Sequence, residues 1–235
     1  MMMIIIKPVN TLIMVIIIVC CGLHANTHHG AQMKVSKAQA QANRAQVVAT
    51  ASTLFRERGY DGVGVADLMA AAGFTHGGFY KQFGSKADLM AEAAACGIAQ
   101  AAALSAEADL ASFVRVYLSR AHRDDRASGC TMAALGGDAA RQPAKVRATF
   151  ASGIEALLAA LSSGLAPAEN GDGGPTRAQL LDLLAHAVGA MVMSRACPDD
   201  SPLADEILAV CHDSIRASLH GGAATAATLH EHSNG

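Results

Sequence analysis

The sequence predicts an all-α protein, with an N-terminal three-helix helix-turn-helix domain followed by a second helical domain. Of its 235 residues, 51% are apolar and only 4% aromatic, with no Trp, which favours close-packed helices over a β-sandwich. The sequence shows no sustained strand alternation and no repeat of fixed period. Residues 56–90 hold two short helix patterns around a tight turn, which is the layout of a helix-turn-helix.

The first 32 residues differ in composition from the rest of the chain. Residues 11–23 read TLIMVIIIVCCGL, an apolar run shorter than the ~20 residues of a membrane-spanning helix. The run suits a secretory signal, but export conflicts with a DNA-binding module downstream. We interpret residues 1–32 as a start-site artefact, with Met33 as the true beginning, or as a disordered extension. A membrane-tethered regulator that uses this segment is the alternative interpretation.

Charge divides the chain unevenly. Residues 34–90 hold seven Lys or Arg against four acids, whereas residues 91–235 hold ten against sixteen. A basic N-terminal part suits a polyanionic partner such as DNA, and an acidic remainder does not.

The sequence predicts neither an enzyme nor a metal or cofactor site. It contains no GxSxG motif, no phosphate-cradling Gly-rich loop and no carboxylate pair beside a His. The cysteines after residue 32 form no CxxC pair and lack zinc spacing, so we expect reduced thiols in a cytoplasmic protein.

The first helix is expected over residues 38–58. An apolar stripe recurs along it at three- and four-residue steps, and Gly59 suits the left-handed position that ends a helix. Lys34, Lys37 and Arg44 lie before or early in this helix and are candidates for phosphate contacts. Solvated charges on an exposed face are an equally good interpretation of each one singly.

A second helix over residues 65–71 and a third from Thr75 complete the motif. Gly73 is the natural residue for the tight turn between them, and Thr75 is a good N-cap. Phe79 and Phe83, four residues apart, are expected to anchor the third helix in the core.

The exposed side of the third helix supplies the predicted DNA contacts. These candidates are Thr75, His76, Gly77, Gly78, Tyr80 and Lys81. Thr75 and His76 suit base edges or phosphates, and Tyr80 a phosphate oxygen. Two adjacent glycines cost a short helix ~1 kcal/mol each, which close approach of the backbone to DNA would offset. Tolerance of a poor helix sequence is the alternative.

A capping box, Ser85 to Asp88, predicts the start of a fourth helix. Its free amides and Lys86 would face a phosphate if this end of the helix abuts DNA. An ordinary cap with a solvated lysine is the alternative.

In these residues the chain resembles the TetR family of bacterial regulators. The resemblance covers residues 45–91 and rests on the run AGFTHGGFYKQFGSKADL at residues 72–89, which agrees with the family pattern in kind and spacing. It implies that Thr75, His76, Gly77, Tyr80 and Lys86 contact operator DNA. Gly64 departs from the pattern, since a Ser or Thr cap is usual there, but Gly is an acceptable cap.

The remaining sequence predicts about five more helices. We expect one amphipathic helix from residue 110 to 121 that ends in a polar loop at residues 122–125. Further helices are expected at 131–140, from Pro143 to about 164, and at 176–195 and 202–219, with a flexible loop at 166–175. The domain boundaries are therefore 33–90 and 91–221, followed by a disordered tail at 222–235.

Two functional surfaces are expected in this second domain. The helix at 176–195 is apolar over more than one stripe, so it is buried on two sides, and the family resemblance implies a homodimer through the last two long helices. The candidate dimer interface comprises Leu180, Leu184, Val188, Met191, Ile207 and Cys211. A core within one chain is the alternative.

The resemblance also implies an effector pocket for an unknown small molecule. Candidates to line it are Phe113, Tyr117, Cys130, Met132, Phe150, His186 and Met193, each of which also fits a plain core position. Cys130 follows Gly129 at a helix start, so a thiol that senses electrophiles is an alternative to a buried one. The sequence thus predicts a dimeric repressor that binds a palindromic operator and is released by an effector, with no membrane partner.

Overall fold

A computed structural model describes residues 36–163 and 174–230 of the chain. The regular elements in these two ranges are all helices, so the predicted all-α fold is confirmed. They are α2 (Lys37–Arg58), α3 (Val65–Ala71), the 3₁₀ helix η1 (His76–Lys81), α4 (Lys86–Ala106), α5 (Leu110–Tyr117), α6 (Arg120–Asp124), α7 (Thr131–Ala139), α8 (Ala144–Ser163), α9 (Arg177–Ala196) and α10 (Pro202–His230).

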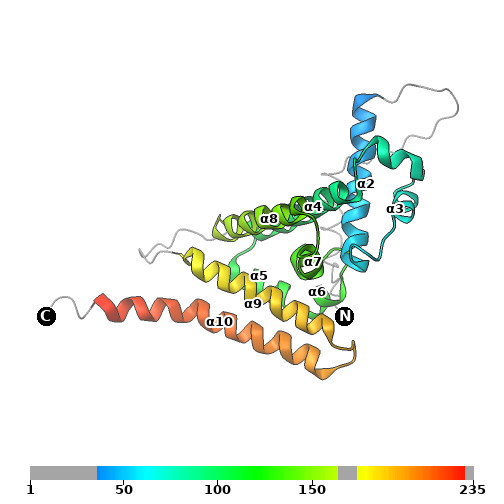
Figure 1. Cartoon of the computed structure of the whole chain (residues 1–235). Helices are drawn as coiled ribbons and strands as arrows, with labels where there is room; N and C mark the ends of the chain where they lie inside the picture. Colours follow the sequence, from blue (N-terminus) through cyan, green and yellow to red (C-terminus); the bar gives the residue numbers. More distant parts are fainter. Residues whose placement is uncertain (1–35, 164–173, 231–235) are drawn as a thin grey trace, which may run out of the picture.

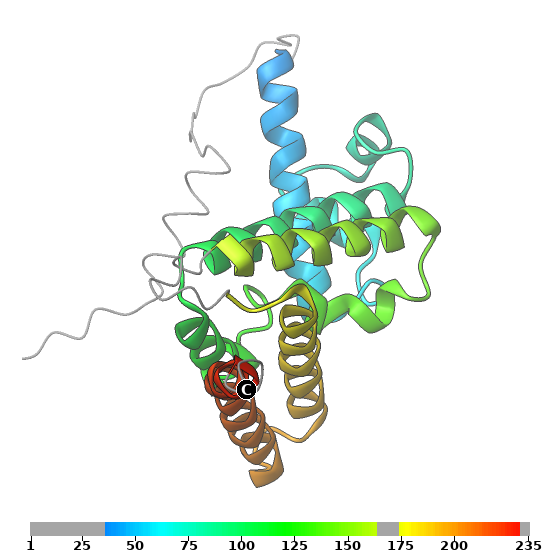
Figure 2. The same cartoon turned by 90° about the vertical axis from the view of Figure 1, so that its left-hand side faces the viewer.

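The helices stack from the N-terminal module to a C-terminal pair (Figure 1). At one end α2 packs with α3 and η1, and α4 carries the chain away from them beside α8. At the other end α9 and α10 lie side by side, and α7 sits between this pair and α2 (Figure 2). α7 therefore contacts both α9 and α2.

Local sequence signals set the ends of the first helices. Ser36 caps α2 by accepting a hydrogen bond from the Gln39 amide, and α2 ends at Gly59, whose φ of 74° suits glycine. Gly73 adopts a φ of 82° in the turn after α3, as the sequence predicts. The third helix differs from expectation in type, because residues 76–81 form a 3₁₀ helix. Two consecutive glycines make a regular α-helix costly there.

The predicted single helix at residues 110–121 is wrong. The helix α5 ends at Tyr117, and Ser119 caps a new helix, α6, by accepting a hydrogen bond from the His122 amide. The residues expected to form a polar loop, 122–125, therefore lie largely in α6, with Arg123 buried. The Ser119 hydroxyl accepts a hydrogen bond from an amide that has no backbone acceptor at the start of α6, and this cap favours a new helix there.

The C-terminal helix is longer than predicted. α10 continues to His230, so residues 222–230 are helical where the sequence predicts a disordered tail. The apolar extension at 1–32 and most of the loop predicted at 166–175 lie outside the described residues.

One apolar core joins the two predicted domains. It runs from Val47 and Phe55 of α2 through Ile98 of α4 to Met191 of α9. Within the described ranges one helix, α4, is long and apolar enough to span a membrane, but eight of its residues are buried against other helices. Its apolarity is that of a core helix.

Candidate nucleic-acid and subunit interfaces

Two buried aromatic side chains fix the orientation of η1. Phe79 and Phe83 are 0% and 2% exposed, and their rings stack with centroids 5.4 Å apart. Their predicted role as core anchors is confirmed. Because η1 has one face pinned inward, its other face must point to solvent.

That outer face carries most of the predicted DNA contacts. Thr75, His76, Gly77 and Lys81 are exposed, and Tyr80 is 67% exposed, which is high for a large aromatic residue. The ring of Tyr80 packs edge-on against both His76 and Phe79, at centroid distances of 6.0 and 5.1 Å. These ring contacts orient the Tyr80 side chain while its hydroxyl remains available to a partner.

The two glycines of η1 face different ways. A Cβ on Gly77 would meet no other atom within 4 Å, whereas one on Gly78 would touch Met69 Cε at 3.5 Å. Gly78 therefore lies toward the body of the module, against the prediction that both glycines face DNA. Gly77 alone offers an open stretch of backbone.

Arg44 is used inside the subunit. Its Nη2 donates to Glu92 Oε1 of α4, its Nη1 donates to the Gln82 carbonyl, and its guanidinium lies 4.2 Å from the centroid of the Phe83 ring. Both terminal nitrogens are thus engaged within the module. The structure places Arg44 as a brace between α2, η1 and α4, and a phosphate contact by its remaining N–H groups stays a prediction.

The two candidate lysines differ in whether they bind within the subunit. Lys37 is exposed at the start of α2. Lys86 is half-buried, and its Nζ donates to the Tyr60 carbonyl at 2.6 Å, which ties the start of α4 to the turn after α2. One of the three ammonium donors of Lys86 is occupied by this bond, and a phosphate contact by the others stays a prediction.

The predicted dimer interface is wrong at three positions. Leu180, Leu184 and Met191 are buried within the subunit, at 3%, 6% and 0% exposure. They point into the core because α9 packs against α7 and α8 as well as α10. The other three predicted residues, Val188, Ile207 and Cys211, are half-buried at the edge of that core.

A different set of apolar residues lies on the surface of the α9–α10 pair. On α9 they follow helical spacing, with Leu181, Val192 and Met193 exposed and Gly189 beside open space. On α10, Leu203 and Val210 are 52% and 61% exposed. We call Leu181, Val192, Met193, Leu203 and Val210 the outer apolar face.

The residues predicted to line an effector pocket differ in how far they are exposed. Tyr117, Cys130, Met132 and Phe150 are buried, while Phe113 and His186 are half-buried. Met193 is 59% exposed on the outer apolar face, so its assignment to an interior pocket is wrong. The 6% exposure of Cys130 also argues against the reactive-thiol alternative, since an electrophile must reach the sulfur.

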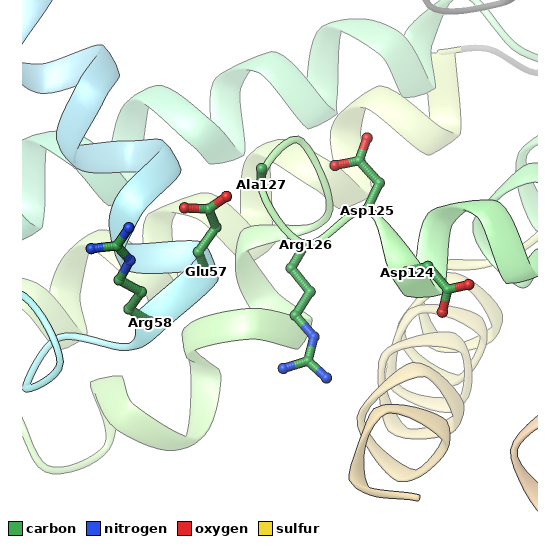
Figure 3. Close-up of a pocket in the computed structure, with 6 residues that line it drawn as sticks. All are labelled: Glu57, Arg58, Asp124, Asp125, Arg126 and Ala127. Carbon is green, nitrogen blue, oxygen red and sulfur yellow. The ribbon is translucent and has the colours of Figure 1, made fainter. Parts of the chain in front are cut away.

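An open concavity lies elsewhere, between α2 and the segment from the end of α6. It holds about 540 Å³ and is lined by Glu57, Arg58, Asp124, Asp125, Arg126 and Ala127. Figure 3 shows Glu57 directed from α2 toward Ala127 across this opening. None of the predicted effector residues lines it.

The segment from α6 to the start of α7 is held by buried groups that the sequence analysis missed. Arg56 of α2 donates from Nε to the Ala127 carbonyl at 2.7 Å. Arg195 of α9 donates to the carbonyls of Arg123 and His122 at 3.0 and 2.8 Å. An Arg side chain that binds a backbone carbonyl far along the chain leaves no recognisable pattern in the sequence. One segment is therefore held from the α2 side and from the α9 side.

His122 fixes the same segment from within. Its Nδ1 lies 2.7 Å from the Tyr117 carbonyl, and its Nε2 accepts a hydrogen bond from the Cys130 amide at 3.1 Å. The imidazole must be neutral, with its proton on Nδ1, to make both bonds. Burial lowers the pKa of His122, which favours this neutral form.

Comparison with known proteins agrees with this arrangement. Residues 47–93 match the family model described as bacterial regulatory proteins, tetR family. Solved structures of similar fold include reduced NemR of E. coli, with 20% identity and a TM-score of 0.59 over 74% of this chain and 94% of that one. Another is a TetR-family regulator from Agrobacterium tumefaciens, with 24% identity and a TM-score of 0.55 over 75% and 97%. No curated protein matches the chain significantly.

A third similar structure is a TetR-family regulator from Streptomyces coelicolor, with 20% identity and a TM-score of 0.57 over 79% of this chain and 83% of that one. At these identities the structures establish a shared fold. The matched family model spans α3, η1 and much of α2, where the predicted DNA contacts lie.

Proposed function

We propose that this chain, whose residues 47–93 match the model of bacterial regulatory proteins of the tetR family, is a helix-turn-helix transcriptional regulator that acts as a homodimeric repressor released by a small-molecule effector. The single observation that carries the proposal is the exposed outer face of η1 on a pinned helix. The domains proposed for these roles are residues 33–90 and 91–221. Its place of action would be the cytoplasm, where the DNA is.

We propose that the outer face of η1 enters the major groove. Thr75 and His76 carry donors and acceptors for base edges, and Tyr80 and Lys81 suit phosphate oxygens. Gly77 lets the backbone approach a phosphate, because nothing projects from it. Lys37, and Lys86 through its remaining donors, would add phosphate contacts at either side.

A homodimer is supported by the outer apolar face. Exposed large apolar residues on two adjacent helices mark an interaction surface, and a two-fold copy of the α9–α10 pair would cover both in a four-helix arrangement. Such a dimer would present two η1 segments to successive major grooves about 34 Å apart, which requires a palindromic operator.

Effector release is supported by the contacts between the second domain and α2. A ligand that favours one packing of the second domain would change the separation of the two η1 segments, and so weaken operator binding. The segment held by Arg56 and Arg195 links the α9–α10 pair to α2, which supports this route.

The test is a titration of the full chain against the DNA upstream of its own gene, by fluorescence anisotropy at several salt concentrations. We expect saturable binding that weakens steeply with salt, because phosphate contacts release counterions. Binding equal to that of a shuffled DNA of the same length, at every salt concentration, would contradict the proposal. Tyr80→Ala and Lys81→Ala should weaken binding, while Arg177→Ala, at an exposed ion pair on α9, should not.

A further inference from the structure

Two arginines near the start of α7, one buried and one half-buried, have no carboxylate partner among the described residues. Arg56 is 7% exposed and donates to the Ser52 hydroxyl and the Ala127 carbonyl. Arg195 is half-buried and donates to two backbone carbonyls. Within the described ranges neither guanidinium forms an ion pair. Asp125 is the nearest acid to influence both, but its carboxylate accepts from Ser128.

Arg123 of α6, by contrast, is a buried arginine with carboxylate partners. Its side chain is 1% exposed, and it pairs with Asp124 and Asp199 at 2.7 and 3.4 Å. A buried cation without such a partner is costly, and neutral carbonyl acceptors offset only part of that cost. The positive charge of Arg56 and Arg195 is therefore offset by Asp125 only at a distance, without an ion pair in the described ranges.

Some buried hydrogen-bonding atoms around the same segment form no hydrogen bond of good geometry. They include Arg195 Nη1, the Tyr117 hydroxyl and the Thr131 hydroxyl, with the Cys130 thiol beside the Tyr117 hydroxyl. Tyr117 and Thr131 are only 7% and 1% exposed. Tyr117 and Arg195 both contact His122, since the Tyr117 and His122 rings lie 4.7 Å apart and Arg195 Nη2 donates to the His122 carbonyl at 2.8 Å.

The N-terminus of α7 adds to the positive potential. α7 has nine residues and begins after Cys130 with no side-chain cap, so its first amides are free to bind an acceptor. Gly129 lets this segment pack closely, because a Cβ there would lie 2.7 Å from the Asp125 carbonyl oxygen and 2.9 Å from Arg195 Nη2. Guanidinium, hydroxyl and helix N-terminus together are donors that suit an oxyanion.

We propose that Arg195, the Tyr117 hydroxyl and the N-terminus of α7 bind the carboxylate of a small apolar organic acid, with Arg56 on the α2 side adding positive charge. The aromatic rings of Phe113 and Tyr117, 5.4 Å apart, supply an apolar wall beside the carboxylate. This inference rests on the proposed function, since the acid would be the effector.

The site also has a route to the surface. Ala127 lines the open concavity of Figure 3, and its carbonyl is the acceptor of Arg56 Nε. Displacement of residues 124–129 would open the concavity to the arginines. The same displacement would break the contact between this segment and α2, so entry of the acid and a change at the DNA-binding module would be one event.

The test measures binding to the full chain without DNA, by calorimetry at constant ionic strength. The probes are benzoate, its neutral isostere benzamide, and inorganic phosphate. We expect benzoate to bind at least ten-fold more tightly than benzamide. Arg195→Met should weaken benzoate binding about ten- to a hundred-fold and Tyr117→Phe several-fold, because hydrogen bonds to charged groups are the strong ones. Arg177→Met, at the exposed end of the same helix, is the matched control and should bind as wild type.

Several outcomes would overturn the proposal. These are no benzoate binding to wild type, equal binding of benzamide, or undiminished binding to Tyr117→Phe, whose fold should survive even if Arg195→Met does not fold. Phosphate binding without benzoate binding would refute the organic acid. If benzoate binds as expected but leaves operator affinity unchanged, the site stands and its effector role is wrong. If the chain binds no operator, the proposed function fails while the binding data still decide the site.

Discussion

The outer face of η1 and the outer apolar face of α9 and α10 are both surfaces that one subunit leaves uncovered, yet they differ in chemistry. Tyr80 on η1 is 67% exposed beside a glycine and a lysine, whereas Val210 on α10 is 61% exposed and belongs to the outer apolar face. A polar face with open backbone suits phosphates and base edges, and an apolar face suits a second apolar surface. The difference predicts that a substitution on the outer face of η1 can weaken DNA binding without weakening dimerisation.

The largest effect is expected from a charge on the outer apolar face. Val192→Glu should weaken dimerisation at least a hundred-fold, because a carboxylate buried at a two-fold interface is repeated and unpaired. Sedimentation velocity measures the change. Leu104→Glu is the matched control, since Leu104 on α4 is 45% exposed against 46% for Val192. Equal loss of dimer in both variants, or in neither, would refute the assignment of this face.

A methyl group on η1 should affect DNA binding alone. Gly77→Ala has open space, so the unfolding temperature should change little, whereas operator affinity should fall about ten-fold if the backbone meets a phosphate. Anisotropy titration and thermal unfolding give the two readings. Gly78→Ala is the comparison, because Gly78 faces Met69 and lies away from the proposed DNA surface. Unchanged affinity in Gly77→Ala would mean that DNA does not approach this backbone.

A substitution in the turn should instead act on stability. Gly73→Ala forces a side chain into a φ of 82°, which should lower the free energy of unfolding by roughly 1 kcal/mol or more. Urea denaturation measures it. A variant as stable as wild type would show that the turn does not require glycine.

A smaller effect is expected from pH. Burial lowers the pKa of His122, so the native state binds its proton less readily than the unfolded chain does. The unfolded imidazole protonates below about pH 6.5, and the free energy of unfolding should therefore fall as the pH drops from 6.5 toward 5. Thermal unfolding over this range should show the slope in wild type and a flatter one in His122→Asn. A slope that is the same in both would assign it to other groups.

The N-terminal module is the better predicted half because its signals are local. Gly59 and Gly73 mark turns that depend on their own backbone, and Phe79 and Phe83 have few alternatives to burial. The outer apolar face could not be read from sequence, because α9 is apolar on more than one side. Which of Leu180 and Leu181 faces inward depends on α7, α8 and α10, which pack against it. Arg56 and Arg195 were missed because their acceptors are backbone carbonyls far along the chain.

The central claim is that the two faces work together, so that DNA binding requires the dimer. The most direct measurement is the stoichiometry and affinity of the full chain on a duplex carrying its own upstream palindrome, for wild type and Val192→Glu side by side. We predict two subunits per duplex for wild type, and for Val192→Glu an affinity at least ten-fold weaker with unchanged helical content. A monomeric Val192→Glu variant that binds this DNA as tightly as wild type would contradict the account.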